Sequence, residues 1–441
     1  MRLAAAGHQR RLRRLAGPGH PRAGPGERRR GSPVVTPGPG PAEAEPAGAR
    51  PAEPEPARPR PARSSPARSS PARSRPARSS PGRSGSGRGR APSRAAVAGM
   101  GHALPARYDQ RTVWDGFFAR HHAGVRAAEQ IFVSSGVTSR HAVANPIFED
   151  VSNWGTAARM ERYLAEAVPL GKDAVAAALT DARLDPGQVG LFAVASCTGY
   201  GTPGIDIRLA RDLGMSDEVQ RLFVGHMGCY AALPGLGAVA DFVAARGRPA
   251  VLLCLELPTL HLQPAGTEVD QVVAHALFAD AAAAIVLLPT DDADPPGFEV
   301  VDVVARTDIS TADYMTWDVT DIGFRMGLSP RVPAVLARHV GAVVDRLLAG
   351  HGLTRDEVAG WAVHPGGRRI LEVVARRLEL PDGSLDASYG VLRDCGNCSS
   401  ATVLLVLSRL RAAGVVAPGQ HVVAMAFGPG LTLYAALLRA R

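Results

Sequence analysis

The chain has 441 residues, enough for two or three domains or for one large two-lobed unit. Its formal net charge of +9 is unevenly distributed, because residues 1–98 hold 21 Arg against 5 Glu and the remainder is mildly acidic. The globular part therefore gives no nucleic-acid signal, and no apolar run reaches the ~18 residues typical of a membrane span.

Cysteine usage indicates the compartment. The five cysteines are an odd number, and three of them lie within or beside apolar runs, which favours a reducing cytoplasm over a disulfide framework. Cys395 and Cys398 have C-x-x-C spacing, but no second pair and no thioredoxin-like context accompanies them. We therefore expect neither a metal nor a redox site there.

Residues 1–94 consist almost entirely of Arg, Pro, Ser, Gly and Ala, with a PARSS repeat across 61–80. Such a segment lacks the apolar residues needed to offset its ordering entropy, so we expect it to be disordered. It could be a basic tail for nucleic acid or anionic lipid, an Arg-rich targeting peptide, or upstream sequence from a misplaced start site. We favour the third interpretation, because a single Lys against 49 Arg indicates a GC-rich genome.

Helical and strand patterns alternate after this segment, which predicts an α/β architecture with mostly parallel sheets. A first strand is expected at 95–99, so Met100 lies inside the domain. Residues 275–289 form a further apolar segment, and 297–323 have the pattern of irregular strands. The other expected helices are 156–182, 205–214, 332–350, 367–378 and 400–412, and the other expected strands are 189–196, 249–257, 358–363 and 421–427.

A weak internal repeat refines this architecture. VGLFAVA at 189–195 matches VAGWAVH at 358–364. A second match follows the same order in each half: a cysteine, a helical pattern, a short Ala/Arg/Gly sequence and a strand pattern. Cys229 and AARG have these places in the first half, and Cys398 and RAAG have them in the second. Two similar halves, 95–328 and 329–441, would pack about a pseudo-two-fold axis. Equivalent turns from the two halves would then converge on one site.

Cys229 is the first candidate for that site. It follows the apolar run 222–224 in a glycine-flanked turn, and a small-residue helical pattern begins directly after it. A helix N-terminus pointing at the sulfur stabilises the thiolate over the thiol. The alternative is that Cys229 is a small buried hydrophobe.

Two partners for Cys229 come from the second half. His364 ends a buried strand and is followed by Pro-Gly-Gly, and sites collect at the carboxyl ends of such strands. Asn397 lies in CGNCSS before an apolar helix, where its amide either caps the helix or donates to an oxyanion. Most other histidines have unremarkable contexts, and His121 and His122 are expected on a helix surface.

The combination of motifs resembles the type III polyketide synthases of the chalcone-synthase-like superfamily. The resemblance rests on Cys229 in GHMGCYAALPGL, His364 in WAVHPGG, Asn397 in GNCSSATVLLVL and the late AFGPGLT, in matching order over residues 95–441. It implies a thiolase-like αβαβα fold, with two pseudo-symmetric halves and mixed sheets, and a homodimer. No metal or redox cofactor is implied, and nucleic-acid or membrane partners are not expected.

The resemblance also implies roles for individual residues. Cys229 would carry the acyl chain as a thioester, and His364 would pair with its thiolate. His364 and Asn397 together would bind the malonyl thioester carbonyl during decarboxylation. Two N–H donors facing one point suit the oxygen-centred charge of a thioester enolate.

Further positions match the family's substrate-binding parts. Phe278 and Phe324 match two aromatic gatekeepers between the CoA tunnel and the cavity, and Arg140 is a candidate for the CoA phosphates. The pocket-lining positions and the cavity-shaping loop are Cys197, Thr198, Thr202, His261, Ser399, Gly428, Pro429 and Gly430.

The predicted activity is decarboxylative condensation of malonyl-CoA onto an acyl-CoA starter, then cyclisation to a pyrone, resorcinol or related product. A ketoacyl-carrier-protein synthase III uses the same three residue types and is the nearest alternative. A catalytically silent scaffold with a nucleic-acid-binding tail is a second, and the intact Cys, His and Asn argue against it.

Overall fold

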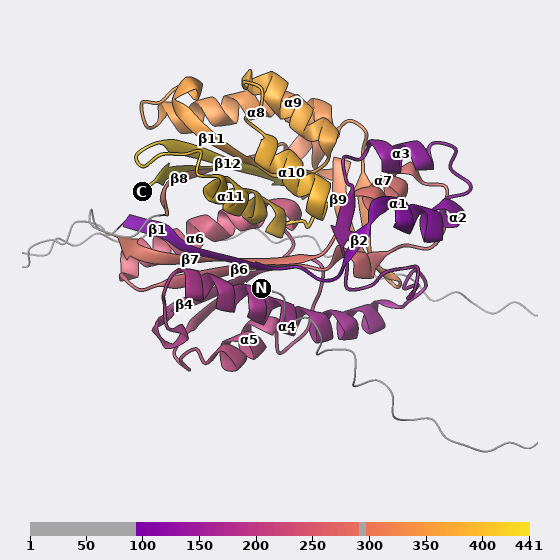
Figure 1. Ribbon diagram of the computed structural model, residues 1–441, viewed down its shortest axis with the longest axis horizontal. Helices are drawn as coiled ribbons and strands as arrows, with labels where there is room; N and C mark the ends of the chain where they lie inside the picture. Colours follow the sequence, from indigo (N-terminus) through magenta and orange to yellow (C-terminus); the bar gives the residue numbers. More distant parts are fainter. Residues whose placement is uncertain (1–93, 291–296) are drawn as a thin grey trace, which may run out of the picture. The chain divides into compact units, whose positions relative to one another are not determined.

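The computed structural model describes residues 94–290 and 297–441. The predicted disordered extension therefore lies, up to residue 93, outside the described residues. A ribbon view shows the described part as alternating layers of helices and sheet (Figure 1).

The sheet consists of two groups of strands, and each group comes mainly from one half of the chain. In the first group, β4, β5 and β6 run parallel, whereas β7 is antiparallel to both β6 and β1. In the second, β11 and β12 run parallel, and β13 is antiparallel to β12 and β8. A short β1–β8 pairing joins the groups in the order β11-β12-β13-β8-β1-β7-β6-β4-β5. The strands are β1 (Arg94–Ala103), β4 (Leu191–Ala195), β5 (Gln220–Val224), β6 (Ala250–Glu256), β7 (Ala281–Thr290), β8 (Phe298–Thr307), β11 (Val358–Val363), β12 (His421–Gly428) and β13 (Thr432–Ala440).

Helices lie on both sides of each group of strands, which gives the five layers of the predicted αβαβα fold (Figure 1). Helices α4 (Thr156–Asp181) and α5 (Ile205–Leu213) cover the outer face of the first group. Helices α6 (Ala232–Arg246) and α11 (Ala401–Ala413) lie between the two groups. Helices α8 (Val332–Ala349) and α9 (Arg368–Leu378) cover the second, and α10 (Asp386–Cys395) packs on α11.

Strand β6 shows why these segments read as continuous apolar runs. Leu252 and Cys254 face the central helices, whereas Leu253 and Leu255 face the outer layer. Strand β12 repeats the pattern, with alternate residues in the central and outer cores. Each fully buried side chain of this size contributes roughly 1.5–3 kcal/mol, so a strand covered on both faces needs apolar residues at every position.

The internal repeat corresponds to the structure. Strand β4 lies beside β6 as β11 lies beside β12, and the central helices α6 and α11 begin just after Cys229 and Cys398. The boundary differs from the expected one at residue 328. Strand β8 pairs with β13, so the second half begins between β7 and β8.

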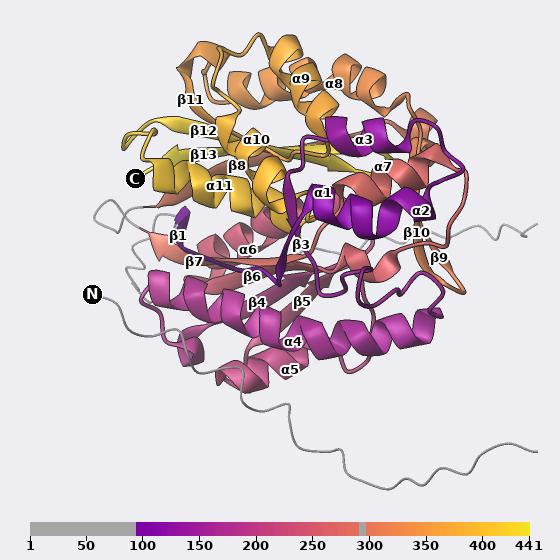
Figure 2. The same ribbon diagram turned by 45° about the vertical axis from the view of Figure 1, so that its right-hand side comes forward.

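The remaining elements gather beside one end of the layers (Figure 2). The expected segment 275–289 divides into the end of a helix and β7, and the sequence analysis did not identify the helices before residue 156, nor α10 and β13. These remaining elements are β2 (Arg107–Asp109), β3 (Ser139–His141), α1 (Gln110–Val113), α2 (Ala119–His121), α3 (Ala128–Ser134), α7 (Val269–Leu277), β9 (Met315–Thr320) and β10 (Gly323–Leu328).

One stretch, Gly228–Arg246, is long and apolar enough by composition to cross a membrane. It contains α6, which lies in the central core between the two groups of strands.

Candidate active site

Cys229 lies in a 3₁₀ turn, Gly228–Tyr230, between strand β5 and helix α6. Gly228 has a φ of +65°, and a Cβ at this position would lie 2.8 Å from the Pro429 ring. A Cβ on Gly428 would lie 3.3 Å from the backbone nitrogen of Cys229. The predicted loop Gly428–Pro429–Gly430 therefore packs directly against the cysteine turn, and glycine permits this close approach.

His364 follows strand β11, and its backbone N–H donates to the Met425 carbonyl at 2.8 Å. The side chain is 1% exposed, and neither ring nitrogen has a hydrogen-bond partner in the part of the chain that the structure describes. Leaving such a group unsatisfied in a buried place costs about 1–3 kcal/mol. Both nitrogens of His364 are therefore available to a bound molecule.

Asn397 follows helix α10 and pairs with Phe278 in a single β-bridge. Its backbone N–H donates to the Leu277 carbonyl at 2.8 Å, and its carbonyl accepts from the Ala279 N–H at 3.0 Å. The side-chain oxygen accepts from the Ser399 backbone N–H at 2.9 Å. Because that N–H is an obligate donor, the amide orientation is fixed, and the –NH₂ group is directed to donate to other partners, Cys229 among them.

Cys229, His364 and Asn397 line one cavity of about 530 Å³. The structure thus brings together one residue from the first half and two from the second, as the internal repeat predicted. Phe278 and Phe427 complete the apolar wall around them.

Burial shifts the pKa values of Cys229 and His364 toward their neutral forms. Burial raises the pKa of Cys229 to about 12 and outweighs the opposing effects of the Ser399 and Asn397 side chains. Burial also lowers the pKa of His364 to about 3. Burial therefore opposes the predicted thiolate at the helix N-terminus and favours a neutral thiol and a neutral imidazole in the ligand-free protein.

A buried carboxyl group, that of Glu256, lies near enough to Cys229 to raise its pKa. Glu256 ends strand β6, is 0% exposed, and accepts hydrogen bonds from Thr198 Oγ1 at 2.7 Å and Ser400 Oγ at 2.6 Å. The Cys197 backbone N–H donates to it at 3.1 Å, and the Cys197 thiol lies 3.6 Å from Ser399 Oγ. Burial raises the pKa of Glu256. The sequence analysis missed this residue, although an acid ending the apolar run PAVLLCLE was a usable signal.

Three of the predicted pocket residues, Cys197, Thr198 and Ser399, line a small cavity of about 20 Å³ together with Cys229. Pro429 also lines it, so this member of the late glycine-rich loop reaches the cavity wall.

Phe278 and Phe324 occupy different positions. Phe278 lines the 530 Å³ cavity, the 20 Å³ cavity and a third of about 50 Å³. Phe324 lines only the third of these, where it stacks on His261 with ring centroids 4.4 Å apart. His261 accepts from the Phe324 N–H at 2.9 Å and donates to the Thr198 carbonyl at 2.7 Å, and burial lowers its pKa to about 4.

Two predicted site residues lie away from the cysteine cavity. Thr202 is exposed, and its hydroxyl donates to the Tyr200 hydroxyl at 3.3 Å. Arg140 is 5% exposed, and its hydrogen bonds all go to protein oxygens of Gln110, His275, Ala276 and Phe278. The candidate role of Arg140 in binding CoA phosphates is therefore wrong, because its donors are already used inside the protein.

The expectation for His122 is also wrong, because this side chain is 2% exposed. Its Nε2 lies 3.0 Å from His275 Nδ1, and the nearby His121 bonds the Gln263 carbonyl at 3.0 Å. These three histidines could hold a metal by proximity. However, the Gln263 backbone N–H donates to His275 Nε2 at 3.3 Å. This fixes the proton of His275 on Nδ1, the nitrogen that a metal shared with His122 would need.

Comparison with known proteins covers both halves of the chain. The family model for chalcone and stilbene synthases matches at residues 83–292 for its N-terminal domain and 303–441 for its C-terminal domain. A 3,5-dihydroxyphenylacetyl-CoA synthase of Streptomyces toyocaensis is 31% identical over 79% of this chain and 90% of the relative. A 1,3,6,8-tetrahydroxynaphthalene synthase of Streptomyces peucetius is 35% identical, over 70% and 82%.

Solved structures give the same picture. The fold is similar to PKS-I from the brown alga Ectocarpus siliculosus, with a TM-score of 0.75 and 29% identity over 80% of this chain and all of that one. The 1,3,6,8-tetrahydroxynaphthalene synthase of Streptomyces coelicolor, a bacterial type III polyketide synthase, gives 0.74 and 26% identity over 78% and 99%.

Proposed function

Because the chain belongs to the chalcone and stilbene synthase family of type III polyketide synthases, we propose that Cys229, His364 and Asn397 are its catalytic residues. The enzyme condenses malonyl-CoA onto an acyl-CoA starter. The observation that carries this proposal is the 530 Å³ cavity that all three line, with both nitrogens of His364 unpartnered inside it.

The first step is acyl transfer to Cys229. The sulfur attacks the thioester carbonyl of the starter, a new C–S bond forms, and the bond to the CoA sulfur breaks. The thiol proton passes to the departing CoA sulfur, with a free nitrogen of His364 as the intermediate acceptor. Because burial raises the pKa of Cys229, we expect the proton to move to His364 after the starter has bound.

The second step is decarboxylation of malonyl-CoA. The bond to the carboxylate carbon breaks, CO₂ leaves, and the electron pair forms an enolate whose charge rests on the thioester oxygen. The Asn397 –NH₂ group and an N–H of His364 donate to that oxygen, and such donors contribute about 3–4 kcal/mol each. The enolate carbon then attacks the acyl-Cys229 carbonyl and releases the cysteine sulfur for another cycle.

The test uses purified protein, malonyl-CoA and a panel of acyl-CoA starters. We expect release of CO₂ and CoA and formation of a pyrone, resorcinol or related product. A parallel arm offers the same acyl groups on acyl carrier protein, as the ketoacyl-carrier-protein alternative requires. Faster turnover with the carrier protein than with CoA would contradict the proposed substrate form.

The CoA phosphates need a cationic site, and Arg140 cannot supply it. We propose Arg368 and Arg369, which are exposed at the beginning of helix α9 and line the 530 Å³ cavity. They also line an adjoining cavity of about 470 Å³. Gly367 caps α9 without a side-chain hydrogen bond, so free N–H groups of the helix face the same region.

Thioesters of N-acetylcysteamine, which lack the CoA phosphates, test this assignment. Replacing both arginines by alanine should raise KM for CoA substrates by about 10-fold or more and leave turnover of the short thioesters unchanged. An equal effect on both kinds of substrate would contradict phosphate binding.

We also propose a homodimer formed along strand β5. This strand is the edge of the sheet, and its first four residues are exposed. Large apolar side chains are exposed on this strand and near it, namely Phe223 (45%) on the strand and Tyr200 (70%) and Ile207 (43%) near it. An edge strand with such a surface favours pairing with a second copy. A Phe223→Glu variant that remained dimeric by light scattering would contradict this interface.

The proposed chemistry needs no metal or redox cofactor, because the side chains supply every proton and hydrogen bond. Activity should survive treatment with EDTA and dialysis, and its loss with recovery on adding a divalent ion would contradict the proposal. We also propose a cytoplasmic location, which accords with the five free thiols.

A further inference from the structure

The C-terminal end of helix α7 has an unusual set of hydrogen-bond partners. The last carbonyls of a helix have no partner within it and must find one elsewhere. Residues 275–278 end this helix, and Leu277 accepts from the backbone N–H of Asn397. The other three carbonyls of this group are bound by a single side chain from another part of the chain.

That side chain is Arg140 on strand β3. Its Nη1 donates to the carbonyls of His275 at 2.7 Å and Phe278 at 3.1 Å, and its Nη2 donates to Ala276 at 3.0 Å. Its Nε donates to Gln110 Oε1 at 2.9 Å, and Gln110 in turn donates to the Ala276 carbonyl at 3.0 Å. The guanidinium fork thus uses its donors to fix the end of α7.

The positive charge of Arg140 also stabilises this helix end, in addition to its hydrogen bonds. Burial lowers its pKa to about 10, so it stays protonated at neutral pH. No carboxylate in residues 94–290 or 297–441 lies within ion-pair distance of it, although the buried Asp280 raises the pKa of Arg140 from further away. A cation at a helix C-terminus is also stabilised by the helix dipole, so the carbonyls of α7 add to this stabilisation.

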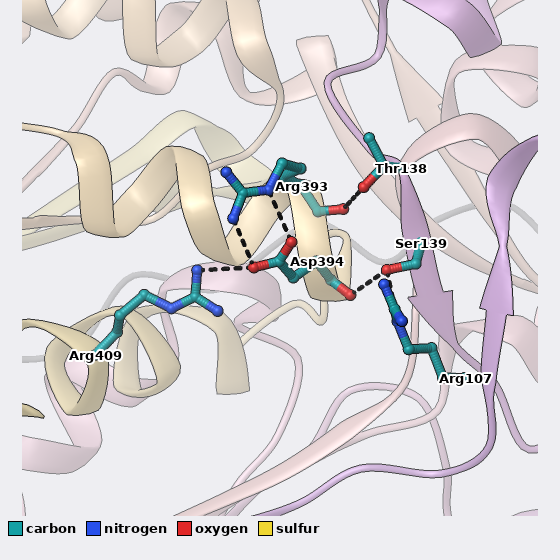
Figure 3. A network of polar contacts seen from close by, with 6 residues as sticks. All are labelled: Arg107, Thr138, Ser139, Arg393, Asp394 and Arg409. Atoms are coloured by element: carbon teal, nitrogen blue, oxygen red, sulfur yellow. Dashed lines mark hydrogen bonds and ion pairs between the residues drawn. The ribbon is translucent and has the colours of Figure 1, made fainter.

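The two residues before Arg140 hold a second helix end, as Figure 3 shows. Thr138 Oγ1 donates to the Arg393 carbonyl at 2.9 Å, and Ser139 Oγ donates to the Asp394 carbonyl at 2.8 Å. The Thr138 backbone N–H also donates to the Arg393 carbonyl at 2.8 Å. These carbonyls belong to the last turn of helix α10, four and three residues before Asn397.

Asn397 therefore lies between two helix ends that the same short segment fixes. Its own backbone is held by one bridge to Phe278, whose carbonyl accepts from Arg140. We propose that Arg140, with the neighbouring Thr138 and Ser139, is a positioning residue that sets the Asn397 amide for decarboxylation. This inference rests on the proposed role of Asn397.

The test compares two activities of one protein. Malonyl-CoA decarboxylation is measured by acetyl-CoA formation, and single-turnover loading of Cys229 is measured by the mass of the acyl-enzyme. Arg140→Lys keeps the charge and loses the fork, so it should lower decarboxylation about 10-fold while loading changes less than about 3-fold. An equal loss of both activities would overturn the proposal.

A matched control is Arg159→Lys. Arg159 is also fully buried and donates to main-chain carbonyls, those of Ser152, Trp154 and Leu262 among them, but none lies beside Asn397. This variant should lose a similar amount of melting temperature and keep the wild-type ratio of decarboxylation to loading. A shift of that ratio as large as in Arg140→Lys would mean that the effect is general to buried arginines.

If Arg140→Lys does not fold, Thr138→Val and Ser139→Ala each remove one side-chain hydrogen bond to the end of α10. Both should shift the ratio in the same direction by a smaller factor, and an unchanged ratio in both would overturn the proposal.

A double variant separates failure of this inference from failure of the proposed function. In an Asn397→Ala background, Arg140→Lys should cause no further loss of decarboxylation, because the amide it positions is gone. A further loss of the same size as in the wild type would overturn the inference alone. Normal decarboxylation by Asn397→Ala itself would instead overturn the proposed role of Asn397.

Discussion

The turns that carry Cys229 and Asn397 occupy equivalent places in the two halves, one before helix α6 and the other before helix α11. They are held differently. The turn of Cys229 follows β5, a full strand paired along its length with β4. Asn397 has only a one-residue bridge to Phe278 and depends on the ends of α7 and α10.

The two equivalent turns thus hold two different groups, a nucleophile in the first half and a hydrogen-bond donor in the second. The first half positions its nucleophile after a full strand of its own sheet, and only the Gly428–Gly430 loop of the second half packs against that turn. The second half positions the amide through elements from the first half, namely β3 and α7. Asn397 is therefore sensitive to distant changes that leave Cys229 in place.

The largest expected effect comes from replacing Cys229, and Cys398 at the equivalent position of the second half provides the comparison. Cys229→Ala removes the acyl carrier and should abolish condensation, with at least about a 10³-fold loss of product by chromatography. Cys398→Ala is the matched control, because Cys398 is also buried and is not among the residues that line the cavity. Similar losses in both variants would contradict the assignment of the nucleophile.

Removing the donor of the second half should have the next largest effect. Asn397→Ala should lower malonyl-CoA decarboxylation about 10²–10³-fold, because one donor to the enolate oxygen is lost. Loading of Cys229, measured by mass, should fall much less. Equal loss of the two activities in Asn397→Ala would contradict the division of roles. His364→Ala should lower both activities, because His364 accepts the thiol proton during loading and donates to the enolate oxygen during decarboxylation.

The pH dependence of the thiol distinguishes the two possible resting states. With the pKa of Cys229 raised to about 12, the thiolate fraction rises about 10-fold per pH unit below that value. Inactivation of the ligand-free enzyme by iodoacetamide should therefore accelerate continuously from pH 7 to pH 10, and Cys229→Ser gives the background. A rate that levels off near pH 7 would indicate a thiolate–imidazolium pair.

The smallest expected effects come from replacing the glycines that directly precede Cys229 and Asn397. Gly228 and Gly396 have φ values of +65° and +77°, and a Cβ would lie 2.8 Å from Pro429 and 2.9 Å from the Leu277 carbonyl, respectively. Each Gly→Ala variant should cost about 1–2 kcal/mol of stability by denaturant unfolding. Gly228→Ala should mainly slow loading and Gly396→Ala mainly decarboxylation, and the reverse pattern would break the comparison.

Much of the layered fold was predictable from the sequence. Doubly covered strands such as β6 and β12 need apolar residues at every position, so they stand out as short apolar runs. The internal repeat is made of these apolar runs and the turns that follow them, so it also predicted that the turns of Cys229 and His364 converge. Short elements such as α2 and β3 were not predictable, because they depend on tertiary partners rather than on their own pattern.

The errors in the site have one physical cause. Arg140 was interpreted as a candidate for the CoA phosphates and His122 as a residue of a helix surface, and both are buried. Burial exchanges the water around a polar group for internal partners, and these partners come from residues far away in the sequence. For Arg140 they are the carbonyls of α7, more than 130 positions later.

Phe278 lines all three cavities, so its side chain affects the space next to Cys229. The cavity of about 20 Å³ next to Cys229 has room for a water molecule or two and none for a growing chain. Growth of a chain into this small cavity would displace Phe278, Trp317 and Met326, which line it together, whereas the 530 Å³ cavity that Cys229 also lines already has room. A substitution at one of these three positions would change the space around Cys229 while the catalytic residues stay the same.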